Sequence, residues 1–453
     1  MRMGVRKALM APFWWLMSFP TVPLLIFIQG VSALLWWIAG SYFGMDTYSS
    51  RSLSGNDGWC DPSIQGLGVH CWGDYYYPIF LLSIANPFSG EFANPYPAAG
   101  LLPFLLFRSL GDFAALPALG LGLYLSLMVG TIAWSVWKAT VGTQFNARVG
   151  LFSALTLFSP PVVMALDRGN SVGFLIPLLI WFFASLRKDH PAHLIASLVL
   201  MSMIKPHFVL LALALMFSGR IRVGVQSALL SLVANTVSFT IFWWNQFPEN
   251  LIQWAFGVIS YQDYATVAKP YLPNISFSQS IYAWFYGLDQ VGVAGLAPVL
   301  DGIESHQGMW GIGIFALVLL MILLFRDTLS RAHIAVLMLS VISMLSATTY
   351  FYYALFAVPT LLALMRERED SSEQFMAVTQ RGITGVGQQI AFVMWLASIC
   401  TLVQLPIFGV SLDTQILTTG TLVGGVWIFS YTAIAIILIR NQRANANMRR
   451  ALQ

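Results

Sequence analysis

The chain has 453 residues, of which 57% are hydrophobic and only 9% are charged, and its mean hydropathy is +0.72. A soluble protein carries roughly 25% charged residues, so this composition excludes a soluble globular domain and indicates a polytopic α-helical membrane protein. The net charge of +4 is small and does not indicate a nucleic-acid partner.

Apolar stretches of about the length needed to cross roughly 30 Å of hydrocarbon recur along the chain. The first follows Arg2, Arg6 and Lys7 and has no small-residue cleavage site, so we expect it to remain as a membrane anchor. We predict an all-α integral membrane protein, a single polytopic domain over residues 1–453 with about twelve transmembrane helices. The predicted spans are 21–43, 113–137, 149–166, 171–186, 191–204, 206–219, 223–244, 308–325, 333–348, 350–365, 389–410 and 416–439.

Two long stretches, 44–112 and 245–307, do not fit into the membrane. The first begins polar and then becomes semi-apolar with repeated proline breaks, which favours short helices lying in the membrane interface. The second is rich in Tyr, Trp and Gly and is too polar to span. We predict that both form large extracytoplasmic segments.

The stretch 191–219 allows two threadings through the membrane. A single crossing would invert every later segment and place eleven basic residues outside, whereas a break at Lys205–Pro206 keeps them inside. With this break and both termini in the cytoplasm, 18 of the 23 Lys and Arg residues lie inside, and 13 of the 19 carboxylates lie outside or in the outer half of the membrane. We therefore predict a multi-pass plasma-membrane protein whose chemistry faces the exterior.

Only three cysteines occur, and two of them, Cys60 and Cys71, share the first outer segment. An oxidising exterior favours a disulfide between them, whereas a reducing or anaerobic cell would leave two free thiols. Cys400 lies within a predicted span.

The first polar motif on the outer side is Gly73-Asp74-Tyr75-Tyr76-Tyr77-Pro78, which follows Cys71. Desolvation by the neighbouring rings would raise the pKa of Asp74 toward the range of a general base. The alternative is a solvated loop aspartate, and the motif by itself does not choose between them.

Two further motifs bring cations to the same side of the membrane. Asp167-Arg168-Gly169-Asn170 forms a tight turn between two spans, where Asp167 and Arg168 could simply neutralise each other. Lys205-Pro206-His207 places a cation at the outer membrane edge, which is costly unless an anion accompanies it. A lipid phosphate suits a lysine at that depth, and snorkelling of the side chain to the interface is the alternative.

Aromatic residues mark a late span junction at Tyr350, Tyr352 and Tyr353, and Asn274 lies in the second outer segment. Sugars bind aromatic platforms, but membrane interfaces use the same residues as belts. No Asp-x-Asp motif, metal-ligand spacing of histidines or Walker loop occurs, so we expect neither a metal nor another cofactor.

In their order along the chain, these motifs resemble the membrane glycosyltransferases of the GT-C type, and specifically glycosyltransferase family 87. The resemblance covers roughly residues 70–365. The matching segments are Gly73–Tyr77, Asn94–Gly100, Arg168–Asn170, Lys205–Pro206, Asn274–Ser280 and Tyr350–Tyr353.

The resemblance implies a GT-C type bundle, a catalytic base at Asp74 and a polyprenyl-phosphate sugar as donor. Members of the family transfer mannose or arabinofuranose to envelope glycans or glycolipids of actinobacteria. We expect Lys205, Arg168 and His207 to hold the donor phosphate while Asp74 takes the proton of an acceptor hydroxyl, with inversion at the anomeric carbon. The residues expected to hold sugar and acceptor are Tyr75, Tyr76, Tyr77, Asn170, Asn274, Tyr350, Tyr352 and Tyr353.

Two other classes of function fit the same sequence. A transporter or flippase for a lipid-linked sugar would use Lys205 and Asn235 in a translocation path. Against it, no pair of corresponding broken helices occurs in two halves of the chain. A non-catalytic assembly subunit would tolerate the loss of Asp74, Arg168 and Lys205 alike.

Overall fold

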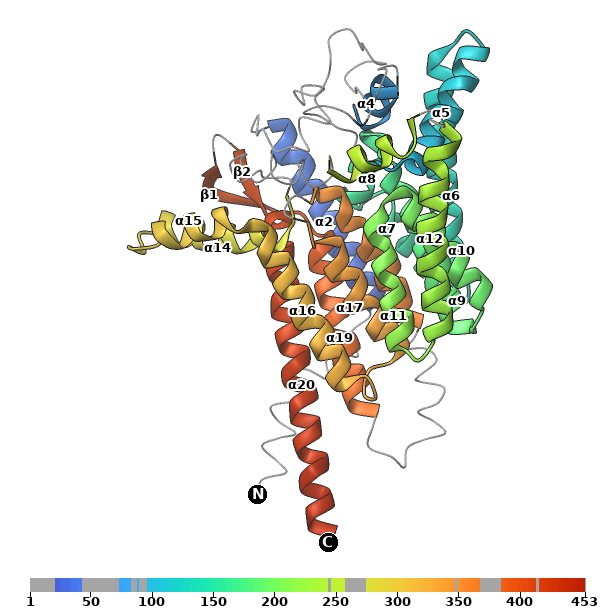
Figure 1. Cartoon of the computed structure of the whole chain (residues 1–453). Helices are drawn as coiled ribbons and strands as arrows, with labels where there is room; N and C mark the ends of the chain where they lie inside the picture. The colour runs from blue at the N-terminus through green and yellow to red at the C-terminus, as the bar shows by residue number, and fades with distance from the viewer. Residues whose placement is uncertain are drawn as a thin grey trace.

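The computed structural model describes residues 21–42, 73–82, 88, 96–242, 246–256, 274–346, 349–366, 384–412 and 415–452. Nearly all described elements are helices packed into one bundle, accompanied by an antiparallel pair of strands (Figure 1). The elements up to residue 242 are α2 (Thr21–Tyr42), α4 (Gly73–Leu82), α5 (Ala98–Phe113), α6 (Pro117–Ala139), α7 (Phe145–Leu155), α8 (Pro160–Asp167), the 3₁₀ turn η1 (Ser171–Phe174), α9 (Leu175–Lys188), α10 (Pro191–Ile204), η2 (Pro206–Leu210), α11 (Leu211–Phe217) and α12 (Ile221–Phe242). The later ones are α14 (Phe277–Gln290), α15 (Ala297–Ser305), α16 (Gln307–Phe325), α17 (Arg331–Ser343), η4 (Phe351–Phe356), α19 (Thr384–Leu402), β1 (Pro406–Leu412), β2 (Gln415–Thr418), η5 (Thr419–Leu422) and α20 (Val423–Leu452).

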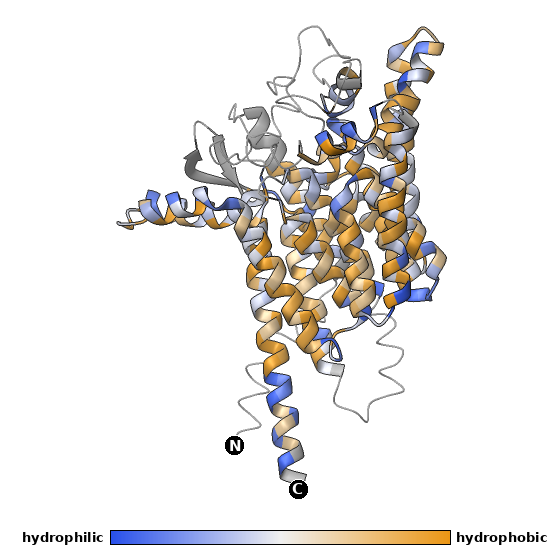
Figure 2. Cartoon of the chain, viewed as in Figure 1, coloured by the Kyte–Doolittle hydropathy of each residue, from blue (hydrophilic) through white to orange (hydrophobic). Residues whose placement is uncertain are grey.

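Several of these helices are long and apolar, which indicates a membrane protein. Six are long and apolar enough to cross a membrane, and α7 with α8, bent by 55° at their junction, adds a seventh if the pair is one crossing. Five shorter apolar helices of 10–17 residues fall in the remaining predicted spans. Each predicted span therefore contains a helix, and Figure 2 shows the bundle as mainly hydrophobic, with a polar lower end of α20.

The helices divide into a buried centre and an exposed periphery. Only 22% of the apolar stretch of α16 is buried, and an apolar helix exposed in this way fits a lipid environment. In α17, by contrast, every residue from His333 to Ser343 is buried. A helix that is apolar on all sides belongs in the middle of a bundle.

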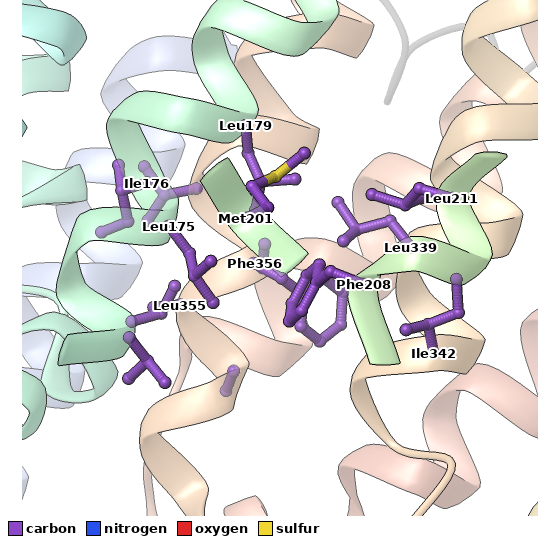
Figure 3. Packing of buried hydrophobic residues seen from close by; sticks show 14 of the residues in the cluster. Leu175, Ile176, Leu179, Met201, Phe208, Leu211, Leu339, Ile342, Leu355 and Phe356 are labelled. Carbon is purple, nitrogen blue, oxygen red and sulfur yellow. The ribbon is translucent and has the colours of Figure 1, made fainter. Parts of the chain in front are cut away.

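The core beneath the predicted outer end is formed where α9, α10, η2, α11, α17 and η4 meet (Figure 3). Phe208 of η2 and Phe356 of η4 belong to this core together with Leu339 and Ile342 of α17, and all four are buried. Because protein interiors are close-packed, this cluster fixes η2 and η4 relative to each other. Each turn directly follows a predicted site residue, Lys205 before η2 and Tyr350 before η4.

The predicted break between the spans 191–204 and 206–219 is confirmed. Lys205 is extended, with φ −141° and ψ 108°, and separates α10 from η2. Asp189 precedes α10 and Arg220 follows α11, yet their Oδ1 and Nη2 atoms are 2.5 Å apart. One continuous helix of about 30 residues would hold its ends about 45 Å apart. The two segments therefore return to the same end of the bundle.

Basic turns that were predicted to be cytoplasmic lie together at the end of α10 away from Lys205. The Nη1 atom of Arg331, the first residue of α17, is 3.5 Å from the second carboxylate oxygen of Asp189. Elsewhere, Arg366 donates from Nε and Nη2 to the carbonyl oxygen of Ala139 at the end of α6, at 3.2 and 3.0 Å. Both contacts join segments assigned to one side of the membrane, which is consistent with the predicted threading.

Two regions differ from expectation. The predicted spans 389–410 and 416–439 include residues that form β1 and β2; α19 ends at Leu402, because Pro406 cannot continue a helix and β-branched residues follow it. In the first outer segment, α5 packs alongside α6, a contact that was not predicted (Figure 1). Gly120 permits this approach, since a Cβ there would lie 2.2 Å from the carbonyl oxygen of Phe107.

Candidate active site

A tight turn between α8 and η1 presents Arg168 and Asn170. Gly169 has φ +65°, a conformation that glycine adopts without strain, and the Tyr124 hydroxyl donates to its carbonyl oxygen at 3.1 Å. The Asn170 side-chain oxygen accepts from the N–H of Val172 at 3.0 Å and so caps η1. The backbone of the turn is therefore fixed from both sides.

Asp74 reaches this turn from a segment 94 residues earlier in the chain. It lies in the first turn of α4, not in a loop as expected. Arg168 donates from Nε to Oδ2 and from Nη2 to Oδ1 of Asp74, both at 2.8 Å, and Asn170 donates from Nδ2 to Oδ2 at 2.9 Å. Bidentate pairing is the strongest arrangement of an arginine with a carboxylate, and the Arg168 and Asp74 side chains are only 6% and 19% exposed.

These contacts lower the pKa of Asp74, contrary to the expectation that desolvation would raise it. Burial by itself raises this pKa, as expected, but the charge and the hydrogen bonds of Arg168 lower it. The hydrogen bond from Asn170 and the charge of Lys205 add to the lowering. Asp74 is thus a carboxylate at neutral pH. Described residues occupy three of its roughly four acceptor positions.

Lys205 lies beside this cluster, and among the described residues it forms no ion pair, although its charge acts on Asp74. Its residue is 9% exposed, and its Nζ lies 4.0 Å from the ring centroid of Tyr96 and 5.8 Å from that of Tyr353. Within the described part of the chain, its ammonium group has no hydrogen bond or ion pair. Cation–π contacts hold a desolvated ammonium by up to about 2 kcal/mol without neutralising it. Its charge remains available to an anion.

Tyr96 interacts with both Lys205 and Asp74. It is buried and carries Lys205 on its ring face. Burial and then the charge of Asp74 raise the pKa of its hydroxyl, so the carboxylate acts on Tyr96 directly. Sequence reasoning placed Tyr96 only inside the Asn94–Gly100 motif and gave it no role, since one tyrosine among sixteen carries little local signal.

The aromatic residues at the span junction Tyr350–Tyr353 lead to Lys205. The rings of Tyr350, Tyr352 and Tyr353 stack in series, with 5.5 Å between successive centroids. Tyr353 in turn lies 6.0 Å from the ring of His207, which is half-buried. Lys205 and this aromatic series therefore belong to one site, and His207 lies beside them as expected.

Asn274 supports the backbone of this junction. Its side-chain oxygen accepts from the N–H groups of Ser276 and Thr349, at 3.0 and 2.9 Å, and the residue forms a β-bridge with Tyr350. The expected sugar contact is therefore not available through the carbonyl oxygen, which has a structural role. An Asn whose side chain bonds the backbone two residues later is a known turn pattern, and this signal could have been read from the sequence.

The three tyrosines after Asp74 point in different directions because they lie on a helix. Tyr75 is buried, with its ring centroid 5.9 Å from that of Phe104 and 4.9 Å from that of Tyr124. Tyr76 is half-buried and Tyr77 is exposed. The expected platform of three rings is therefore wrong for Tyr75, which is a core residue.

Three site residues share a backbone arrangement. Asn170, Lys205 and Tyr350 are each extended and immediately precede a 3₁₀ turn, η1, η2 and η4 respectively. Each turn leads into an apolar helix. The first N–H groups of a helix lack partners within it and carry partial positive charge, so the site is built around three helix beginnings.

The remaining predictions concern the cysteines and a metal site. Cys60 and Cys71, predicted to pair, fall outside the described part of the chain. Cys400 is a free, half-buried thiol. Among the residues that the structure describes, no group of three His, Cys, Asp or Glu side chains is placed to hold a metal ion.

Neither a protein-family model, nor a curated protein, nor a solved structure matches this chain. Its assignment therefore rests on the motifs and on the cluster formed by Asp74, Arg168, Asn170, Tyr96 and Lys205.

Proposed function

We propose that the chain is an inverting membrane glycosyltransferase of the GT-C type, similar to glycosyltransferase family 87. It transfers a mannosyl or arabinofuranosyl residue from a polyprenyl-phosphate sugar to a cell-envelope glycan or glycolipid. The observation that carries the proposal is the convergence of a carboxylate, Asp74, and a buried cation, Lys205, from distant segments, with no ion pair to Lys205 among the described residues. Such a transfer needs a proton acceptor and a positive charge at the leaving phosphate.

In the proposed topology, the twelve apolar helices cross the plasma membrane with both termini in the cytoplasm. Lys205 then lies at the outer junction of two short crossings, α10 and η2–α11. A polyprenyl chain stays in the bilayer, so its phosphate lies at the interface, at the depth of this junction.

The donor phosphate first meets Lys205 and not Arg168. Arg168 is already paired with Asp74 through its Nε and Nη2 atoms, whereas the Lys205 ammonium contacts aromatic rings among the described residues. Tyr353, whose ring lies 5.8 Å from the Lys205 ammonium, and His207 beside it extend the site.

In the reaction, the acceptor hydroxyl oxygen forms a bond to the anomeric carbon as the bond from that carbon to the phosphate oxygen breaks. The bonding electron pair leaves with the polyprenyl monophosphate, whose added negative charge Lys205 stabilises. The hydroxyl proton passes to Asp74. Protonation of Asp74 weakens its pair with Arg168, which can then turn toward the phosphate.

The test is to incubate purified protein with decaprenyl-phosphate arabinose or polyprenyl-phosphate mannose and candidate acceptors, and to look for a glycan product. Asp74→Asn removes the proton acceptor and should abolish transfer while donor binding persists. The matched control is Asp112→Asn, since Asp112 is an exposed carboxylate that also pairs with an arginine, Arg108, and its loss should leave transfer unchanged.

Substantial turnover by Asp74→Asn would reject its role as base. Movement of a lipid-linked sugar across the bilayer without any glycan product would instead favour a flippase.

A further inference from the structure

The two helices α14 and α15 form a hairpin with two sharply different sides. On α14, Ile281, Trp284, Phe285 and Leu288 follow one another at helical spacing and form a single apolar stripe. The opposite side carries Tyr282, Tyr286, Asp289 and Gln290. Trp284 and Leu288 are exposed and Ile281 and Phe285 are partly exposed, so the described part of the chain leaves much of this stripe uncovered.

The turn that joins the two helices is apolar as well. Its sequence is Val-Gly-Val-Ala-Gly-Leu, with positive φ at Gly292 and Gly295, and Val291 is 74% exposed. Turns in water are usually rich in polar residues. An exposed turn without a charged or hydrogen-bonding side chain is the kind of apolar patch that marks an interaction surface.

The hairpin lies across the direction of the apolar helices. Figure 1 shows α14 and α15 running sideways from the bundle, whereas α16 and α20 run along it. Ser280 Oγ donates to the carbonyl oxygen of Thr421, at 2.6 Å, which fixes the hairpin at the beginning of α20. The Trp284 ring lies 5.1 Å from that of Phe429, an exposed residue of α20. The apolar stripe is therefore continuous with the exposed apolar surface of α20.

The charges of the hairpin gather on its other side. Burial and then the charges of Glu304, Asp301 and Asp289 raise the pKa of the Tyr282 hydroxyl, which places acidic groups of both helices near one face. Residues 274–307 contain no Lys or Arg. Binding to an anionic lipid surface through basic residues is therefore excluded for this element.

We propose that the α14–α15 hairpin lies flat in the outer interface of the bilayer, with the stripe around Trp284 and Leu288 and the Val291 turn in the acyl region. Asp289, Asp301 and Glu304 then face water. The occupant of the apolar face is the lipid surface itself, held by apolar burial and not by headgroup charge. This arrangement is independent of any catalytic activity.

The placement would also fix the depth of the candidate site. Asn274, at the root of the hairpin, is bridged to Tyr350, the first ring of the series that leads to Lys205. A hairpin held in the interface would thereby hold the aromatic junction at the level of lipid headgroups.

The experiment compares two neighbouring positions of α14, one on the apolar stripe and one beside it on the polar face. An environment-sensitive fluorophore is attached at Leu288→Cys or at Asp289→Cys, in a full-length chain whose native cysteines are replaced by alanine, reconstituted at one copy per nanodisc of phosphatidylcholine. We expect doxyl-labelled lipid to quench the Leu288→Cys probe at least threefold more than the Asp289→Cys probe. Aqueous iodide should show the reverse order.

Equal access of iodide to both probes would overturn the proposal, because the stripe would then face water. Shielding of the Leu288→Cys probe from both quenchers would also overturn it, because protein would then cover the stripe. A second measurement keeps the native cysteines: benzoylphenylalanine at position 288 should form lipid adducts detectable by mass spectrometry, whereas position 289 should form few. Replacing phosphatidylcholine by anionic lipid should leave the order unchanged, and a dependence on anionic lipid would contradict the stated mode of binding.

Discussion

Replacement of Arg168 by Gln tests whether the Asp74–Arg168 pair is the structural and electrostatic centre of the site. The pair is bidentate at 2.8 Å, with little solvent exposure. Removing one partner of a buried pair costs about 3–5 kcal/mol, because the other charge remains without compensation. Asp74 keeps the hydrogen bond from Asn170 and the nearby charge of Lys205, so we expect the lower end, about 3 kcal/mol.

The loss should depend on pH. In the wild-type protein the pKa of Asp74 lies below its ordinary value of 3.8, so the pair contributes fully to stability above that value and its contribution is lost as the pH falls through the lowered pKa. In Arg168→Gln, the arginine no longer outweighs the effect of burial on the pKa of Asp74, so this pKa rises. The variant should therefore be least stable, relative to wild type, at neutral pH, and should recover part of the difference as the pH falls and its carboxyl takes up a proton.

The assay is thermal unfolding of the purified protein in detergent at pH 7.5 and pH 5, followed by intrinsic fluorescence. For a chain of this length, about 1 kcal/mol corresponds to about 1 °C, so Arg168→Gln should lower the midpoint by about 3 °C at pH 7.5. Arg108→Gln is the matched control, because the Arg108–Asp112 pair is exposed and should contribute no more than about 1 kcal/mol. Equal shifts for the two variants, or a shift for Arg168→Gln that does not change with pH, would refute the reasoning.

Three further outcomes follow from the contacts of the site. Tyr96→Leu should weaken binding of polyprenyl phosphate to the purified protein about tenfold, because the Lys205 ammonium loses its aromatic support and turns toward Asp74. Tyr96→Phe keeps the ring and should bind normally, so equal losses in both variants would contradict this. Lys205→Gln should weaken the same binding roughly 10- to 100-fold and reduce its dependence on salt, so an unchanged titration would remove Lys205 from the site. Gly169→Ala should destabilise the protein by about 1 kcal/mol, since φ is +65° there, whereas Gly130→Ala, in a helix with open space around it, should be neutral or stabilising in the same unfolding assay.

Local patterns predicted the helical spans and the interruption between α10 and η2. Length of apolar sequence is a local property, and Pro206 removes a backbone donor at one position. The balance of basic residues then decided between one crossing and two around Lys205. The Asp189–Arg220 pair agrees with that choice.

The partners of the site residues could not be predicted in the same way. Arg168 was expected to hold a phosphate, but it pairs with Asp74, which is 94 residues away and depends on the rotation of α4 about its axis. Nothing in the local sequence specifies that rotation. It also decides that Tyr75 faces the core while Asp74 faces the arginine. The role of Tyr96 likewise depends on long-range packing.

The three helix beginnings at Asn170, Lys205 and Tyr350 imply that part of the positive potential comes from the main chain. Peptide dipoles are present whichever side chain occupies a position. Exchange of a single residue should therefore leave a measurable residual affinity for a negatively charged lipid. Variation at these positions would adjust the strength of attraction while the direction of the field stays set by the course of the backbone.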